Sequence, residues 1–370
     1  MFRVALTITD NAQLHNVDII DNNAAGKSVV LERISMMRVF TILAGAAALA
    51  TPHAAIGETL PGCSVALAYS QAHQGLAVLV LRDGEVVCSS AKVDEPHEVW
   101  SGTKSLVGLM AAAAVQDGML RLDETAANTL TEWRSDPQKS TVTLRQLLSM
   151  TAGQPSAVGR PQGYADSLKI ALVAAPGTRF QYGPAPMQII GEVMRRKLIA
   201  AGQDPNPRSY IERRLLAPIG VRVAEWRNGP DGNPLMAQGL VLSAREWVKI
   251  GEFVRAGGTV GGRALVDKHA FAELFQGTEA NAAYGLTWWL PRQSASRDPV
   301  TRTADFAMSP TGLPRDMVVA AGAGDQRLYV IPSQRLTIVR QARLDLAALL
   351  MRSGGADWSD RQFLTLLLGK

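Results

Sequence analysis

The pattern of apolar and polar residues is dominated by one segment, from Trp100 to Leu122. Between Leu106 and Val115 this segment carries no charged residue on any side. A helix at the surface of a protein keeps a polar face, whereas a helix that is apolar all round is typical of the interior. Gly118 suits the left-handed residue that often ends a helix. The pattern therefore predicts a buried helix that begins near Trp100.

Strand-like patterns lie on both sides of this helix. Residues 76–89 (LAVLVLRDGEVVCS) place two β-rich runs around Asp83-Gly84, a strong signal for a hairpin. Further strands are predicted at 259–266, 284–290, 316–324, 326–332 and 335–342.

Helical patterns fill the region between the two groups of strands. Helices are predicted at 141–150, 187–200, 209–216 and 242–254, with a last one at 357–368. This order predicts an α+β fold, an antiparallel sheet flanked by helices with a second, mostly helical lobe. The sheet lobe would comprise about 56–130 and 241–370, and the helical lobe about 131–240.

The N-terminal region has the pattern of a secretory signal peptide, predicted over residues 36–55. A basic residue precedes a short apolar run that ends at Ala48-Leu49-Ala50, and the run is too short for a stable membrane span. Translation would then start at Met36 or Met37, and residues 1–35 would be an upstream extension or a disordered segment. The alternative is a genuine extension with a buried apolar helix. Export would place the mature chain in the periplasm or outside the cell.

Composition adds two points. The net charge of +5 is spread along the chain without basic blocks, which gives little support for nucleic-acid binding. The two cysteines, Cys63 and Cys88, are an even pair, which in an exported protein suggests one disulfide. Residues 60–63 (LPGC) resemble a lipoprotein cleavage box, but they lie too far beyond the apolar run for lipidation to be favoured.

Ser101 and Lys104 supply candidate chemistry at the head of the buried helix. Their spacing puts both side chains on one helix face, within reach of a hydrogen bond. A serine hydroxyl needs a base, and an amine can serve once burial or a nearby positive charge lowers its pKa from about 10.4. The helix N-terminus would also stabilise a developing oxyanion. Ser-x-x-Lys occurs by chance in many helices, so further motifs have to support the interpretation.

Such motifs follow in a characteristic order, and together they span nearly all of the mature chain. They are WSGTKS at 100–105, LLSMTAG at 147–153, PGTRFQYG at 176–183, YGLTWW at 284–289 and GAGDQRLYVIP at 322–332. With these motifs in this order, the chain resembles the superfamily of serine β-lactamases and penicillin-binding proteins. It is most similar to the branch with class C β-lactamase-related esterases and 6-aminohexanoate-dimer hydrolase, and the resemblance implies a β-lactamase/transpeptidase-like fold.

The resemblance implies roles for three side chains. Ser101 matches the acylated nucleophile, and Lys104 matches the amine that takes or relays its proton. Tyr182 matches the tyrosine of the second motif, whose phenol is expected to be partly ionised beside a protonated lysine and to pass the proton to the leaving group. The alternative for Tyr182 is a packed aromatic residue that caps the following helix.

The chain departs from the family pattern at two motifs. Pro184 stands where the second motif has an asparagine that orients the substrate. When Gly322 is aligned with the glycine of the third motif, Ala320 and Ala321 stand in place of the motif's Lys and Thr.

The backbone N–H groups of these motifs are still available as hydrogen-bond donors, because they do not depend on the replaced side chains. The resemblance then implies an oxyanion hole from the N–H groups of Ser101 and Ala323, with a slip to Gly324 as the alternative register. Gly322, Gly324 and Trp288 are the expected substrate contacts, although one tryptophan of the Trp288-Trp289 pair is expected to fill the core.

Competing chemistry has little support in the sequence. The chain has no Gly-x-Ser-x-Gly elbow, its five histidines are scattered, and no metal-binding spacing occurs, so no metal or cofactor is expected. The resemblance implies an exported serine hydrolase that forms an acyl-enzyme on small carboxylic esters or amides. The alternatives are a β-lactamase or D-alanyl-D-alanine carboxypeptidase, and a non-catalytic relative that binds peptidoglycan. No nucleic-acid partner and no membrane span after signal cleavage are expected, and the oligomeric state stays open.

Overall fold

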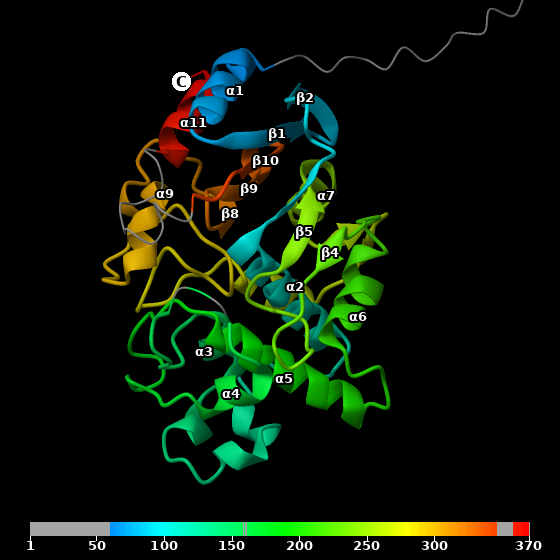
Figure 1. Cartoon of the computed structure of the whole chain (residues 1–370), viewed down its shortest axis with the longest axis vertical. Coiled ribbons are helices and arrows are strands. Elements are labelled where there is room, and N and C mark those ends of the chain that lie inside the picture. The colour runs from blue at the N-terminus through cyan, green and yellow to red at the C-terminus, as the bar shows by residue number, and fades with distance from the viewer. Residues whose placement is uncertain (1–59, 158, 160, 346–357, 370) are drawn as a thin grey trace, which may run out of the picture. The chain divides into compact units, whose positions relative to one another are not determined.

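Five antiparallel strands form the main sheet, in the order β2-β1-β10-β9-β8 (Figure 1). The computed structural model describes residues 60–157, 159, 161–345 and 358–369. The strands are β1 (Gly75–Arg82), β2 (Glu85–Ser89), β8 (Val318–Gly322), β9 (Gln326–Ile331) and β10 (Leu336–Ala342). All seven residues of β10 are buried, so this central strand is covered on both faces.

Helices cover the two faces of the sheet. Thr337 contacts α7 (Ala244–Arg255), where a Cβ at Gly251 would overlap the threonine side chain, so only glycine allows this approach. Arg340, three residues along the same strand, bonds Ser70 of α1 (Cys63–Ala72). Residues an odd number apart in a strand point to opposite faces. Helix α1 packs in turn on α11 (Asp360–Leu368).

The predicted central helix is present as a short 3-10 turn, Trp100–Gly102, followed by α2 (Thr103–Gln116). Every residue of α2 from Thr103 to Ala114 is buried, in agreement with its uncharged pattern. Gly118 follows the helix with φ 68°, the left-handed conformation expected there. In Figure 1, α2 lies between the strands of the main sheet and the helices of the middle region.

The middle region is mostly helical. Its helices are α3 (Leu144–Leu148), α4 (Tyr164–Lys169), α5 (Ala185–Ala200) and α6 (Pro207–Ile211), with a π-helical turn at Glu212–Leu216. Short 3-10 turns cover Ala126–Asn128, Thr131–Trp133, Lys139–Thr141, Pro299–Thr303 and Pro332–Gln334. A second sheet joins β3 (Pro96–Glu98), β5 (Leu240–Ser243) and β4 (Glu225–Trp226), and β6 (Thr259–Val260) pairs with β7 (Arg263–Ala264). The remaining helices are α8 (Lys268–Glu273) and α9 (Asp305–Met308).

The α+β class with an antiparallel sheet and a mostly helical lobe is confirmed. The exact lobe limits stay predictions, and the signal peptide over 36–55 lies outside the described residues. Within the described part of the chain, no helix has both the length and the apolar composition needed to cross a membrane.

Two predicted strands are wrong. Residues 259–266 form the short hairpin of β6 and β7, which turns at Gly261 and Gly262, instead of one strand. Residues 284–290 form only isolated bridges, because Thr287 adopts φ 74° and Gly285 N donates to Trp288 O in a tight turn. Two helix predictions need smaller corrections. The segment 209–216 continues α6 as a π-helical turn, and α7 begins at Ala244 because Ser243 caps it. The sequence pattern did not predict α1.

The disulfide prediction is confirmed, since Cys63 and Cys88 are bonded. Their Cα atoms lie 5.6 Å apart, and the bond ties α1 to β2. With its sulfur in this bond, Cys63 has no free thiol.

Candidate active site

The predicted Ser-x-x-Lys pair meets at the junction between the 3-10 turn and α2. Lys104 Nζ lies 2.8 Å from Ser101 Oγ, within hydrogen-bond distance. Trp100, directly before the serine, has φ 49°, a conformation that non-glycine residues rarely adopt. Strained backbone of this kind persists where the surrounding structure holds it, and it is common at functional sites.

Lys104 is buried, with 3% of its surface exposed. Its amine also contacts the carbonyl oxygen of Ala237 at 2.9 Å. Gln188 of α5 anchors the adjacent backbone, because its side-chain oxygen accepts from the backbone N–H of Met236 at 2.8 Å. Burial disfavours the charged amine and lowers the pKa of Lys104 to about 7. A substantial fraction of the amine is therefore neutral near pH 7 and can accept a proton.

Tyr182 reaches the same place from the segment just before α5. Its backbone N–H donates to Oδ2 of Asp298 at 2.9 Å, and its carbonyl accepts from Ala157 N at 3.0 Å. Asp298 is itself buried and accepts from Val300 N at the start of a 3-10 turn. The sequence analysis missed Asp298, although an aspartate directly before Pro299 is a usual start for a helical turn.

The ring of Tyr182 packs among aromatic side chains. Its centroid lies 5.8 Å from that of Trp289 and 5.9 Å from that of Tyr284, and Lys104 Nζ is 4.9 Å from it. Burial raises the pKa of Tyr182 to about 12, while a hydrogen bond with Ser101 acts in the opposite direction. These pKa directions argue against the expected pair of ionised phenol and protonated lysine. They favour a neutral phenol beside a neutral amine.

The strand end before the turn between β8 and β9 lies directly against the backbone that precedes Ser101. A Cβ at Gly322 would overlap the carbonyl oxygen of Val99, so only glycine permits this approach two residues before Ser101. Gly324 and Asp325 both have positive φ, at 71° and 58°, which closes the turn tightly. Ala323, the predicted second oxyanion donor, lies within this turn, and Gly324 lies next to it.

The positions that replace the third-motif side chains lie on β8. Ala320 is fully buried and Ala321 is partly buried. Pro184 precedes α5 and occupies its N-cap position. None of these three residues brings a charged or amide side chain to the site.

The placement of Trp288 does not fit its expected contact with substrate. Its side chain is fully buried and packs 5.7 Å from Phe275, so it has no surface to offer a ligand. The alternation of a strand would point the two tryptophans apart, but they lie in a turn, and both are buried. Trp289 is the one that packs beside Tyr182.

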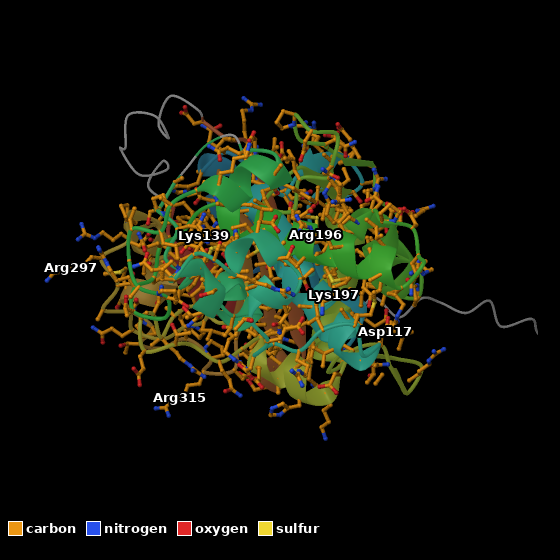
Figure 2. The ribbon with its side chains drawn as sticks, turned by 90° about the horizontal axis from the view of Figure 1, so that it is seen from below. Asp117, Lys139, Arg196, Lys197, Arg297 and Arg315 are labelled. Carbon is orange, nitrogen blue, oxygen red and sulfur yellow. A yellow bond between two sulfur atoms is a disulfide. The ribbon has the colours of Figure 1, made fainter. Side chains whose placement is uncertain are left out.

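A separate cleft of about 530 Å³ lies in the helical lobe, away from Ser101. Figure 2 views that side of the molecule and labels Lys139, Arg196 and Lys197. Lys139 donates to Leu168 O at 2.8 Å, Arg196 pairs with Glu132 at 2.7 Å, and Lys197 pairs with Glu124 at 2.9 Å. Each of these cations therefore already has a partner within the protein. Among the described residues, no group of His, Cys, Asp or Glu side chains could hold a metal ion.

Comparisons with known proteins identify the family and the fold of the chain. The family model described as Beta-lactamase matches residues 54–345. The chain therefore belongs to the β-lactamase family. Among curated proteins, none matches this sequence significantly.

Three similar solved structures share the fold at low sequence identity. A penicillin-binding protein homologue from Caulobacter crescentus has a TM-score of 0.62 at 15% identity, covering 84% of this chain and 97% of its own. EstCE1, a hydrolase with promiscuous acyltransferase activity, has a TM-score of 0.60 at 15% identity, and the match covers 83% of this chain and 96% of EstCE1. A Bacillus anthracis protein assigned as a 6-aminohexanoate-dimer hydrolase has a TM-score of 0.58 at 16% identity, and the match covers 76% of this chain and 78% of that protein.

The lowered pKa of Lys104 predicts a specific dependence of stability on pH. Above pH 7 the folded lysine is increasingly neutral, whereas the unfolded lysine stays protonated up to about pH 10.4. The unfolded state then binds more protons, so the free energy of unfolding should rise with pH by up to about 1.4 kcal/mol per unit. Urea unfolding of wild type and Lys104→Met between pH 7.5 and 9.5 measures this slope.

Only the wild type and Ser101→Ala, which keeps the lysine, should show this slope relative to Lys104→Met. Parallel curves for wild type and Lys104→Met would contradict the lowered pKa.

Proposed function

We propose that this protein is a serine hydrolase that forms an acyl-enzyme on Ser101. The main support is the 2.8 Å approach of Ser101 Oγ to a buried amine whose pKa is lowered to about 7. The neutral amine of Lys104 accepts the hydroxyl proton as Oγ attacks the acyl carbon of the substrate. The developing negative charge forms on the former carbonyl oxygen.

Tyr182 acts as the acid for the leaving group. The centre of its ring lies 4.9 Å from Lys104 Nζ, and its interaction with the Ser101 side chain lowers its pKa against the effect of burial, which supports a role for the phenol in proton transfer beside these two groups. With a pKa of about 12, the neutral phenol can donate to a departing alkoxide, and the ammonium of Lys104 then restores its proton. Water completes the cycle by attacking the acyl-serine, and its proton returns through the same groups.

The backbone N–H groups of Ser101 and Ala323 stabilise the oxyanion. The close approach of Gly322 to Val99 supports this assignment, because it brings the β8–β9 turn against the nucleophile segment. Backbone donors fixed in a folded site need little reorganisation as charge develops, which makes them effective in the transition state.

Small uncharged esters and amides are the proposed substrates. Penicillin-recognising relatives use the Lys and Thr of the third motif toward a substrate carboxylate, and here Ala320 and Ala321 stand in their place. Arg327 on the neighbouring strand does not supply the missing charge, because it is buried and paired with Asp360 at 2.7 Å.

Export to the periplasm or the cell exterior is part of the proposal. The disulfide between Cys63 and Cys88 supports it, since such bonds persist mainly in oxidising compartments.

Ser101→Ala should abolish turnover of p-nitrophenyl butyrate, with a loss of at least about 10³-fold, because it removes the nucleophile. It should leave the melting temperature nearly unchanged. A fluorophosphonate probe should add one label to the wild type and none to the variant, as read by intact mass. Equal turnover in the two proteins would end this mechanism.

Tyr182→Phe should lower kcat by roughly 10²- to 10⁴-fold, since it removes the acid while keeping the ring. The loss should be larger for an alkyl ester than for a p-nitrophenyl ester, whose leaving group needs less protonation. Tyr284→Phe is the matched control, because it removes a buried hydroxyl from the same aromatic cluster and should stay near wild type. Equal effects of the two substitutions would show that Tyr182 contributes only packing and does not act as the acid.

Without a carboxylate-binding side chain at Ala320 or Ala321, the enzyme should hydrolyse p-nitrophenyl butyrate with a higher kcat/KM than nitrocefin. Each missing charge-assisted hydrogen bond is worth roughly 1.5–3 kcal/mol, or about one to two orders of magnitude in affinity. Rates are corrected with Ser101→Ala as the blank. A higher kcat/KM for nitrocefin would favour the penicillin-recognising alternative.

A further inference from the structure

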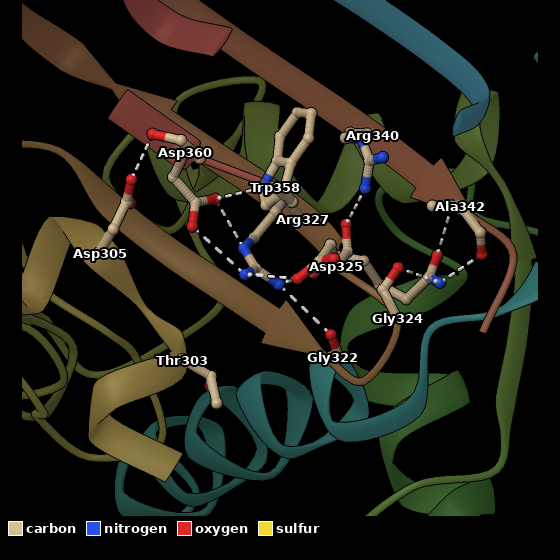
Figure 3. A network of polar contacts seen from close by, with 12 residues as sticks. Thr303, Asp305, Gly322, Gly324, Asp325, Arg327, Arg340, Ala342, Trp358 and Asp360 are labelled. Atoms are coloured by element: carbon tan, nitrogen blue, oxygen red, sulfur yellow. Dashed lines mark hydrogen bonds and ion pairs between the residues drawn. The ribbon is translucent and has the colours of Figure 1, made fainter. Parts of the chain in front are cut away.

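A buried ion pair lies beside the turn that carries Ala323. Arg327 of β9 and Asp360 of α11 are only 3% and 1% exposed, and Nε of the arginine donates to Oδ1 of the aspartate at 2.7 Å. Figure 3 shows Arg327 between Asp360 and the carbonyl oxygen of Gly322. Trp358 and Tyr329 also donate to Asp360, so this carboxylate is held firmly.

The two Nη groups of Arg327 donate hydrogen bonds to the turn itself. Its Nη1 donates to the carbonyl oxygens of Gly322 at 3.3 Å and Gln326 at 3.1 Å. Its Nη2 donates to the carboxylate of Asp325 at 3.3 Å. The guanidinium is planar and rigid, so fixing it at Asp360 also fixes where these donors point.

Two neighbouring side chains hold other carbonyls of the same turn. Arg340 Nη1 donates to Asp325 O at 2.8 Å, and Gln326 Nε2 donates to Gly324 O at 3.3 Å. Side chains thus hold the carbonyl groups of Gly322, Gly324, Asp325 and Gln326, four of the five residues from 322 to 326.

The carbonyl of Gly322 belongs to the same peptide group as the N–H of Ala323. In a planar trans peptide these two groups point in opposite directions. A donor that fixes the Gly322 oxygen on one side therefore directs the Ala323 N–H to the other side.

We propose that Arg327, anchored by Asp360, is a positioning residue that aims the Ala323 N–H at the oxyanion by fixing the Gly322–Ala323 peptide. This inference rests on the proposed function, in which Ala323 is an oxyanion donor. It makes α11, close to the C-terminal end of the chain, part of the support of the active site.

A purely structural ion pair and a positioning pair predict different kinetics. An oxyanion donor acts mainly in the transition state, so misaiming it lowers kcat and leaves KM nearly unchanged. Loss of a structural contact lowers the melting temperature without a selective loss of kcat.

The first variant is Asp360→Asn, which keeps the shape and removes the charge. For p-nitrophenyl butyrate, kcat should fall about 10- to 100-fold with KM within about twofold, below the full 10²–10³-fold cost of losing one donor. The second variant, Asp325→Asn, removes a weaker partner of Arg327 at a left-handed position that asparagine tolerates. Asp325→Asn should fold even if Asp360→Asn does not. Its kcat should fall about 3- to 10-fold, because the oxyanion donor would be less well aimed.

Glu192→Gln is the matched control. Glu192 is a buried carboxylate on α5 that pairs with Arg195 and Arg196 in the helical lobe. This variant should lose melting temperature, as Asp360→Asn does, but keep the wild-type kcat. All assays are run well below the melting temperature of each variant.

Hydrogen exchange of the peptide that contains residues 322–326 gives a readout that does not need activity. Exchange in this peptide should become faster in Asp360→Asn and Asp325→Asn and stay unchanged in Glu192→Gln. Faster exchange with a selective loss of kcat supports the proposal. Unchanged exchange, or a kcat equal to that of Glu192→Gln, overturns it. A wild type without turnover refutes the proposed function, and exchange then still decides whether Arg327 and Asp360 hold the turn.

Discussion

The chemistry proposed for this site depends on a buried amine that has no carboxylate partner among the residues that the structure describes. Lys104 Nζ contacts a hydroxyl at 2.8 Å and a carbonyl oxygen at 2.9 Å, neither of which carries a charge. Burial therefore lowers the pKa of Lys104 to about 7 instead of stabilising the ammonium. A carboxylate at either place would hold the lysine protonated and remove its ability to accept a proton.

Such a site has to be assembled from distant parts of the chain. The amine and the hydroxyl share one helix end, but the phenol comes from the segment before α5, and the β8–β9 turn lies more than 200 residues after Ser101. Glycine at position 322 allows that turn to touch the backbone of Val99. Asp298 fixes the backbone of Tyr182 through a hydrogen bond of 2.9 Å. Each contact holds one functional group against the helix end, so local changes at any of them would alter the site.

The sequence predicted the features that depend on local pattern. The uncharged run in α2, the Asp83-Gly84 hairpin and the pairing of Cys63 with Cys88 all follow from residues close in sequence or few in number. It did not predict features that depend on tertiary contact. The pattern of residues 284–290 suits a strand, yet Thr287 lies in a left-handed turn, where its N–H donates to Leu148 O and its carbonyl accepts from Ser105 Oγ. Likewise, a phenol beside a lysine was expected to ionise, but burial of both groups shifts both pKa values toward the neutral forms.

The same distinction explains how the third motif can lose its side chains and still support the proposed chemistry. Alanines at 320 and 321 remove the groups that would bind a carboxylate, but they leave the hydrogen bonds of the β8–β9 hairpin intact, where Ala321 still pairs with Arg327. Recognition of a charged substrate depends on those side chains, whereas an oxyanion hole depends on the direction of a peptide group. In the proposed arrangement, that direction is set by Arg327, which donates to the Gly322 carbonyl, and by Asp360, which pairs with the arginine. In the proposed mechanism, substrate preference and transition-state stabilisation therefore rest on different residues of one hairpin, and one can change without the other.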